Sequence, residues 1–159
     1  MKFKVELQGA KEITDLLKRV PKEKEAEVKA EMGDVALKIQ RRAKAYLRTQ
    51  AAMDTGHLST TILAEFSPTK IEAEIGPTAK YGPYIEFGAG PAVGRKKFFP
   101  PMEALESWAR QHGFESAWPI CKAISERGLR ARPYLTPAYD DFEGELLIRL
   151  QRVMGKEWK

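Results

Sequence analysis

Few side chains in this sequence have the chemistry of a catalytic group. A nucleophilic mechanism needs a Cys or Ser beside a His and a group that orients the imidazole. The sequence contains two histidines, His57 and His112, and one cysteine, Cys121. His57 follows a Thr-Gly turn, and His112 ends an expected helix, where an imidazole is favourable. Cys121 falls on the inner face of another expected helix, which indicates a buried structural thiol. We therefore expect none of the three to be catalytic.

Glu86 is a lone carboxylate in the aromatic and apolar segment KYGPYIEFGAG, residues 80–90. Alternation over an expected strand at 83–88 puts Phe87 on the core side and Glu86 on the other. A hydrolase that used Glu86 would need a partner acid or base and a raised pKa in a cleft. We favour a structural ion pair or an interface hydrogen bond, for example with Arg132, within one subunit or between subunits.

Two other clusters superficially resemble ligand sites. Asp140, Asp141 and Glu143 form an acidic group, but their spacing matches no calcium loop, and the first turns of a helix explain them. The segment GAGPAVGRKK, residues 88–97, lacks the ordered glycines and the final Gly-Lys-Ser/Thr of a phosphate-binding loop. We therefore expect no cofactor and no metal, and the sequence does not argue for an enzyme.

The composition limits the class of protein. The chain has 159 residues, a net charge of +5 and a single cysteine, which excludes an internal disulfide. No apolar run approaches the roughly 20 residues of a membrane span, and the N-terminus lacks the apolar core of a signal peptide. We expect the protein to be kept in a cytoplasm, or in a particle assembled there. Its basic charge, with a loop at Arg95, Lys96 and Lys97, leaves open a nucleic-acid-binding module as the alternative function.

Apolar spacing predicts the elements that would position these residues. Val28, Met32, Val35 and Ile39 step by three or four residues, which is typical of an amphipathic helix. The full set of expected elements is a strand at 2–8, a short helix ending before Pro21, a long helix at 22–48, a turn at 53–57, a hairpin with strands at 58–66 and 70–76, a strand at 83–88, a loop at 89–100, two short helices between Pro101 and Gly128, and a final helix with Thr136 as its N-cap.

This order of elements predicts the fold class. We expect one α+β domain over residues 1–159, with an antiparallel sheet of about three to four strands. The sheet would pack against the long N-terminal helix and the C-terminal helix.

Three motifs occur in order along the chain: MDTGHLSTTI at 53–62, KYGPYIEFGAG at 80–90 and RARPYLTPA at 130–138. Together they resemble the neck and tail-completion proteins of long-tailed bacteriophages, a family also described as minor tail components or head-to-tail joining proteins. The matching residues are Thr55, Gly56 and Leu58 in the first motif, Tyr81, Tyr84, Ile85, Glu86, Phe87 and Gly88 in the second, and Arg132, Pro133, Tyr134, Leu135, Pro137 and Ala138 in the third. Residues 95–129 depart from the pattern as an apparent two-helix insertion.

The resemblance implies a non-enzymatic structural protein of the virion, located in the neck or at the tail terminus. Such proteins form a ring, commonly six-fold, that joins the tail to the head connector while DNA passes through the lumen. The implied partners are other copies of the chain, the tail tube or tail terminator, and the head connector. The implied location is the virion, after assembly in the host cytoplasm. An open sheet edge and long amphipathic helices suit the heterologous contacts that a ring needs.

Overall fold

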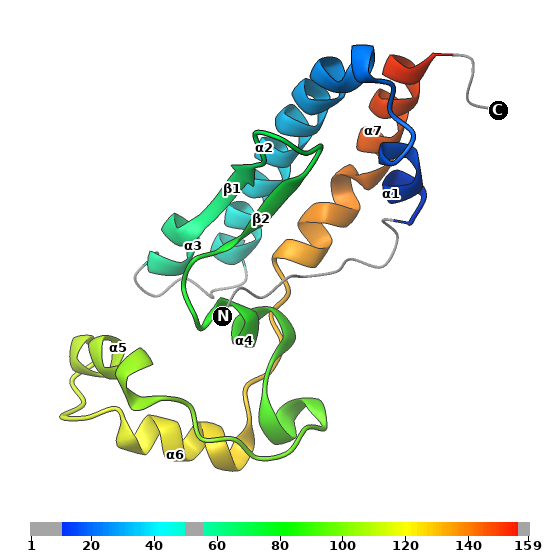
Figure 1. The fold of residues 1–159 in the computed structure, drawn as a ribbon. Coiled ribbons are helices and arrows are strands. Elements are labelled where there is room, and N and C mark those ends of the chain that lie inside the picture. The colour runs from blue at the N-terminus through cyan, green and yellow to red at the C-terminus, as the bar shows by residue number, and fades with distance from the viewer. Residues whose placement is uncertain (1–10, 50–55, 156–159) are drawn as a thin grey trace. The chain divides into compact units, whose positions relative to one another are not determined.

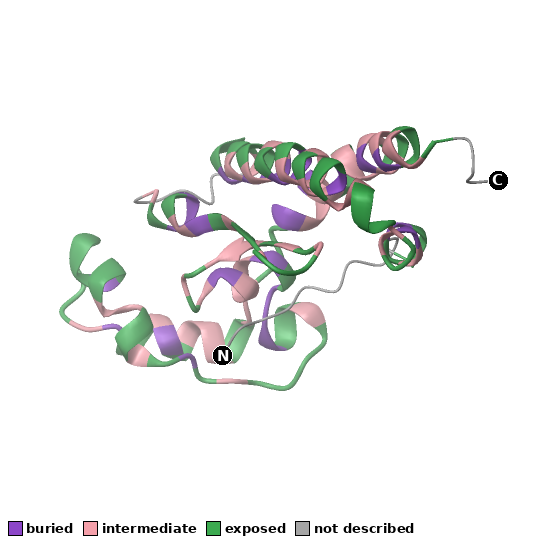
Figure 2. Cartoon of the chain, turned by 45° about the horizontal axis from the view of Figure 1, so that its top comes forward, coloured by how far each residue is buried: buried purple, intermediate pink, exposed green. Residues whose placement is uncertain are grey.

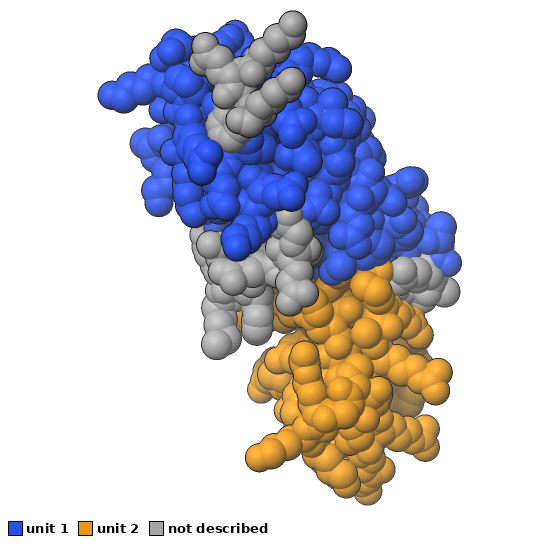
Figure 3. Space-filling model, turned by 90° about the vertical axis from the view of Figure 1, so that its right-hand side faces the viewer, with its two compact units in different colours: residues 1–78, 134–159 blue, residues 79–133 orange. Residues whose placement is uncertain are grey.

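The computed structural model describes residues 11–49 and 56–155. The strand expected at 2–8 and most of the turn expected at 53–57 lie outside these residues. The chain divides into two compact units, which Figure 3 shows in different colours. Unit 1 comprises residues 1–78 and 134–159, and unit 2 comprises residues 79–133. The α+β class is confirmed.

Unit 1 is organised around two long helices, α2 (Glu25–Thr49) and α7 (Leu135–Met154), which pack side by side (Figure 1). The long helix predicted from the 4-3-4 spacing is therefore present, and Val28, Val35 and Ile39 are buried along it. Figure 2 colours the buried residues of the chain purple. Two shorter helices precede α2, namely α1 (Lys11–Leu17) and η1 (Lys22–Lys24). The last helix begins two residues earlier than expected, because Tyr134 and not Thr136 occupies the N-cap.

The predicted hairpin is present and packs on α2 (Figure 1). Its strands, β1 (Ile62–Phe66) and β2 (Ala73–Pro77), are antiparallel, with Ile62 opposite Pro77 and Phe66 opposite Ala73. Ile62 is fully buried, and the Gln40 side-chain amide donates to its carbonyl at 2.7 Å. These contacts attach the sheet to the long helix.

The first part of the expected strand at 58–66 is instead the short helix α3 (His57–Thr61). The hydroxyls of Thr60 and Thr61 donate to backbone carbonyls three residues earlier, at 2.7 and 2.8 Å. Hydroxyl side chains offer the backbone this local alternative to a sheet ladder. The chain therefore enters the sheet only at Ile62.

The third strand predicted at 83–88 is wrong, because this segment is the helix α4 (Gly82–Phe87). Pro83 lies in the first turn, and Gly88 follows the last turn with a φ of 66°. Proline at the start and glycine just past the end are helix signals that override a short alternation. Within the described residues the sheet therefore has two strands and not three or four. Glu86 is 2% exposed and Phe87 is 40% exposed, the reverse of the predicted faces.

Unit 2 is built from short elements around a small core. Besides α4 it contains η2 (Gly90–Val93), η3 (Met102–Ala104), α5 (Glu106–Gln111) and α6 (Trp118–Arg127). The two short helices expected between Pro101 and Gly128 are α5 and α6, whereas η2 lies in the segment expected to be a loop. Ala109, Ala117 and Cys121 are fully buried together, and Met102 and Leu105 pack against them. In the ranges 11–49 and 56–155, no helix combines the length and apolar character needed to cross a bilayer.

Ion pairs join α2 to α7 along their length. Arg42 Nε lies 2.6 Å from Asp141 Oδ2, and the Tyr46 hydroxyl donates to the same oxygen at 3.0 Å. Both bonds favour the charged carboxylate, so they lower the pKa of Asp141, with the Arg42 bond contributing most. The acidic cluster at 140–143 thus includes a residue that connects the two long helices.

A second group of charges lies further along the same two helices. Lys38 Nζ is 2.7 Å from Glu145 Oε1, and Arg149 lies 2.7 Å from Glu31 and 2.6 Å from Glu145. The hydrogen bond from Lys38 is the main reason that the pKa of Glu145 is lowered. An ion pair that belongs to such a network contributes more to stability than an isolated surface pair does.

These two carboxylates predict how stability depends on pH. A carboxyl whose pKa is lower in the folded state adds stability above its unfolded pKa, which is about 4, and loses it as pH falls through the folded pKa. We therefore expect the urea midpoint of unfolding to fall as pH is lowered from about 5 to about 3. The double variant Asp141→Asn, Glu145→Gln should have a lower midpoint at pH 7 and a flatter profile. Asp140→Asn, which removes an exposed carboxylate outside these ion pairs, is the control, and an unchanged profile in the double variant would contradict this account.

Candidate functional site

The second motif and the start of the third lie side by side in unit 2. Ala89 and Leu129 exchange two backbone hydrogen bonds, each 2.8 Å long, as an isolated antiparallel bridge. The Arg132 amide donates to the carbonyl of Ile85, inside α4, at 2.7 Å. Two segments about 40 residues apart in sequence therefore form one backbone-paired substructure, which we call the clasp (residues 85–90 and 128–132).

The clasp requires glycine at Gly88. The backbone there has a φ of 66°, and a Cβ would lie 2.6 Å from the Leu129 carbonyl oxygen and 2.7 Å from the Ala131 nitrogen. Real Cβ atoms essentially never come that close to backbone atoms, so a side chain would force the two segments apart. The motif glycine is explained by this close approach as well as by its left-handed backbone.

Glu86 belongs to the clasp region as a buried group. Burial of a carboxylate is costly unless it is hydrogen-bonded or paired, so the structure supports a structural role over a solvated one. The Arg132 backbone reaches α4 through the bond to Ile85, while the Arg132 side chain is exposed. The predicted ion pair between the Glu86 and Arg132 side chains stays a prediction.

The two tyrosines of the second motif have separate surroundings. Tyr81 is the N-cap of α4, and burial raises the pKa of its phenol. The ring of Tyr84 stacks on Phe98, with ring centroids 5.2 Å apart and planes 17° from parallel. This stack attaches α4 to the loop that comes after η2.

The remaining motif residues enter the core of unit 1. Tyr134 and Leu135 are buried where α7 begins, and Pro137 lies in its first turn. In the first motif, Gly56 has a φ of 73° before α3 and Leu58 is buried, while Thr55 lies outside the described residues. These residue types are therefore accounted for by turns, helix starts and packing.

The three side chains considered as catalytic groups, His57, His112 and Cys121, belong to three different elements. His57 begins α3 in unit 1, and His112 follows α5, with Nδ1 2.8 Å from the Trp108 carbonyl and its ring stacked on Trp108 at 4.0 Å. Cys121 is fully buried, and this burial raises the pKa of its thiol, which opposes formation of the reactive thiolate. Among the described residues, no three His, Cys, Asp or Glu side chains gather as metal ligands would.

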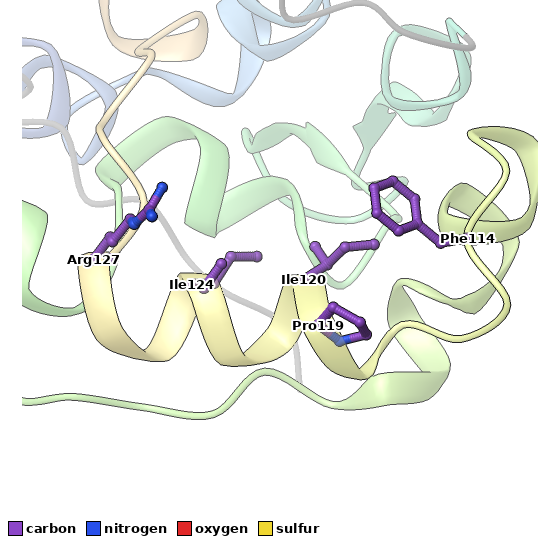
Figure 4. Close-up of a pocket in the computed structure, with 7 residues that line it drawn as sticks. Phe114, Pro119, Ile120, Ile124 and Arg127 are labelled. Carbon is purple, nitrogen blue, oxygen red and sulfur yellow. The ribbon is translucent and has the colours of Figure 1, made fainter.

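Two surface grooves were not predicted from the sequence. One is a cavity of about 320 Å³ on α6, lined at one end by Phe114, along its length by Pro119, Ile120 and Ile124, and at the other end by Arg127 (Figure 4). The other is a cavity of about 260 Å³ in unit 1, between α2 and the hairpin. The second is formed by residues from two separate segments, and periodicity within one segment gives no sign of such a groove.

No protein-family model, curated protein or solved structure matches this chain. The likeness to phage neck proteins accordingly rests on the three motifs.

The close approach at Gly88 predicts an unequal effect of two glycine substitutions. Gly88→Ala should lower the free energy of unfolding by more than about 2 kcal/mol, because it adds backbone clashes to the strain of a left-handed residue. Gly94→Ala is the matched control, because Gly94 has a φ of 69° but nothing within 4 Å of its Cβ position. That variant should lose only about 1–2 kcal/mol. Denaturant unfolding measures both, and equal losses would show that the clasp does not require close backbone contact.

Proposed function

We propose that this protein is a structural component of a phage neck or tail terminus. Copies of it would assemble head to tail into a ring that joins the tail to the head connector, with DNA passing through. The observation that supports this proposal is the ordered set of three motifs behind a long amphipathic helix and before a C-terminal helix. The clasp adds support, because it makes two of these motifs parts of one substructure.

Exposed apolar side chains further support an assembly role. Large exposed apolar residues are unremarkable one at a time, but a subunit that binds copies of itself or other proteins needs such surface. They occur in both units: Leu37, Leu63, Phe66 and Ile148 in unit 1, and Phe87, Phe99, Trp108, Phe114 and Trp118 in unit 2. Heterologous contacts between identical subunits require two different complementary surfaces, and each unit offers candidates.

A nucleic-acid-binding module is the second candidate, favoured by the charge of unit 2. Residues 79–133 contain nine Lys or Arg and five Glu, a net +4 of the +5 of the whole chain. Arg95, Lys96 and Lys97 are exposed together. If duplex DNA were the main partner, the logarithm of the binding constant should fall with the logarithm of salt concentration by about one unit per phosphate contacted. No binding to a 20-base-pair duplex at low salt would end this candidate.

Deletion of the gene tests the proposed function directly. In the phage or prophage that encodes this chain, the deletion should leave DNA-filled heads and tails that are not joined, as counted by negative-stain electron microscopy. Purified protein added to that lysate should restore joined, infectious particles, whereas buffer alone should not. Normal yields of joined particles from the deletion strain would contradict the proposal.

A further inference from the structure

The cavity in unit 1 forms an apolar groove between α2 and the hairpin. Its apolar lining comes from Ala30, Met32, Gly33 and Leu37 on α2, and from Phe66 and Ala73 on the hairpin. Leu37 is 43% exposed and Phe66 is 48% exposed, so two large side chains line the groove without being covered. At about 260 Å³ the groove lies just below the range of about 300–1,000 Å³ typical of small-molecule pockets. Its size suits a single inserted side chain.

Gly33 opens this groove from within α2. A Cβ at Gly33 would lie 3.8 Å from Phe66 Cε1, which is an ordinary contact distance. Packing inside the subunit therefore does not demand glycine there, although glycine in a helix interior is less favourable than alanine. The absence of a side chain at Gly33 leaves the Phe66 ring accessible from the groove.

The hairpin beside the groove carries three carboxylates and one cation, Lys70, which leaves a net negative charge. Glu65 and Glu74 face each other directly in the strand register, and Glu72 lines the groove. Like charges directly opposite each other on a sheet are destabilising. All three carboxylates are exposed, and none takes part in an ion pair within the described residues. Of the cations nearby, Lys29 is directed to the Pro68 carbonyl at 3.4 Å.

The loop between η2 and η3 has the complementary character. Arg95, Lys96 and Lys97 are consecutive, exposed and outside any ion pair in the described part of the chain. Phe98 is fixed by its stack on Tyr84, and the next residue, Phe99, is 50% exposed. The loop therefore presents three cations and then the exposed side chain of Phe99, which directly follows the fixed residue Phe98.

We propose that this basic loop of one copy docks on the hairpin and groove of a second copy. Phe99 enters the α2–hairpin groove, and the cations at 95–97 face Glu65, Glu72 and Glu74. Residues of the loop and of the groove are exposed, and a second copy of the chain offers a partner of complementary charge for each. A buried aromatic anchor supplies most of the affinity of such a contact, and the charges supply rate and orientation.

The contact is head to tail, because the two copies use different surfaces. Repetition of a heterologous contact gives a ring when the rotation closes and a filament when it does not. This inference specifies the contact between copies that the proposed function requires, and it rests on that function only for closure into a ring.

Substitution of the aromatic anchor gives the first test. We expect the wild-type protein to self-associate in sedimentation equilibrium at about 50 mM salt, and to dissociate progressively as salt screens the charges. Phe99→Ala should weaken association by at least about 10-fold, as expected for a hot spot. Phe114→Ala removes another exposed phenylalanine of unit 2, outside this loop, and should associate as wild type does. A monomeric wild-type protein at low salt, or equal association of both variants, would overturn the inference.

Charge exchange gives the second test. One variant has Glu65→Lys and Glu74→Lys, and the other has Arg95→Glu, Lys96→Glu and Lys97→Glu. Each variant alone should lose association, because like charges then meet at the contact. A mixture of the two should associate again with the variants in alternation, because each contact between unlike variants is either the natural pair or the pair with the charges at 65, 74 and 95–97 exchanged. Circular dichroism checks that both variants are folded, and a mixture that stays dissociated would refute the contact.

The outcomes separate this contact from the proposed function and from DNA binding. If both charge variants join heads and tails normally in the deletion lysate, the contact is wrong and the proposed function stands. If wild-type copies associate as described but the deletion strain assembles normally, the contact stands and the proposed function is wrong. Restored association in a mixture that contains only protein cannot come from DNA. If the variant with Arg95→Glu, Lys96→Glu and Lys97→Glu loses duplex binding but still self-associates, the basic loop is assigned to nucleic acid instead.

Discussion

Two backbone hydrogen bonds between Ala89 and Leu129 hold unit 2 closed. They span about 40 residues, and the entropy of closing such a loop must be offset by what the closure allows to pack. The offset comes from the Arg132–Ile85 bond and from the small core around Cys121. The loop with Arg95–Lys97 lies within the closed segment. The exposed cations of unit 2 are therefore presented by a substructure that depends on backbone pairing more than on a large core.

Charge is distributed differently in the two units. In unit 1, cations and carboxylates pair across α2 and α7, as Arg42 does with Asp141 and Lys38 with Glu145. In unit 2, the cations outnumber the carboxylates, and the run at 95–97 is unpaired within the described residues. The paired charges serve the fold of unit 1, whereas unpaired exposed charges change association with other molecules. The contact proposed between copies depends on local charges, namely the run at 95–97 and the hairpin carboxylates Glu65, Glu72 and Glu74.

The elements that sequence reasoning predicted well are long or strongly patterned. The α2 helix follows from apolar residues that keep helical spacing from Val28 to Ile39, and the hairpin follows from Ile75 and Ala73 alternating with Glu74 and Glu72. The prediction of a strand at 83–88 was wrong because alternation over six residues does not distinguish a strand from a short helix. The pair Pro83 and Gly88 was the better signal. The groove between α2 and the hairpin and the Ala89–Leu129 bridge could not be predicted, since they depend on which distant segments meet.

The Arg-Pro motif acts mainly through its backbone. A residue before proline is restricted to extended conformations, so Pro133 favours an extended Arg132. An extended segment is what an antiparallel bridge at Leu129 and a bond from the Arg132 amide to Ile85 require. Proline itself has no amide hydrogen, so the pairing ends there and the chain proceeds to the N-cap of α7 at Tyr134. In the segment that suggested an active site, Gly88 thus has its explanation in how two chain segments are held together.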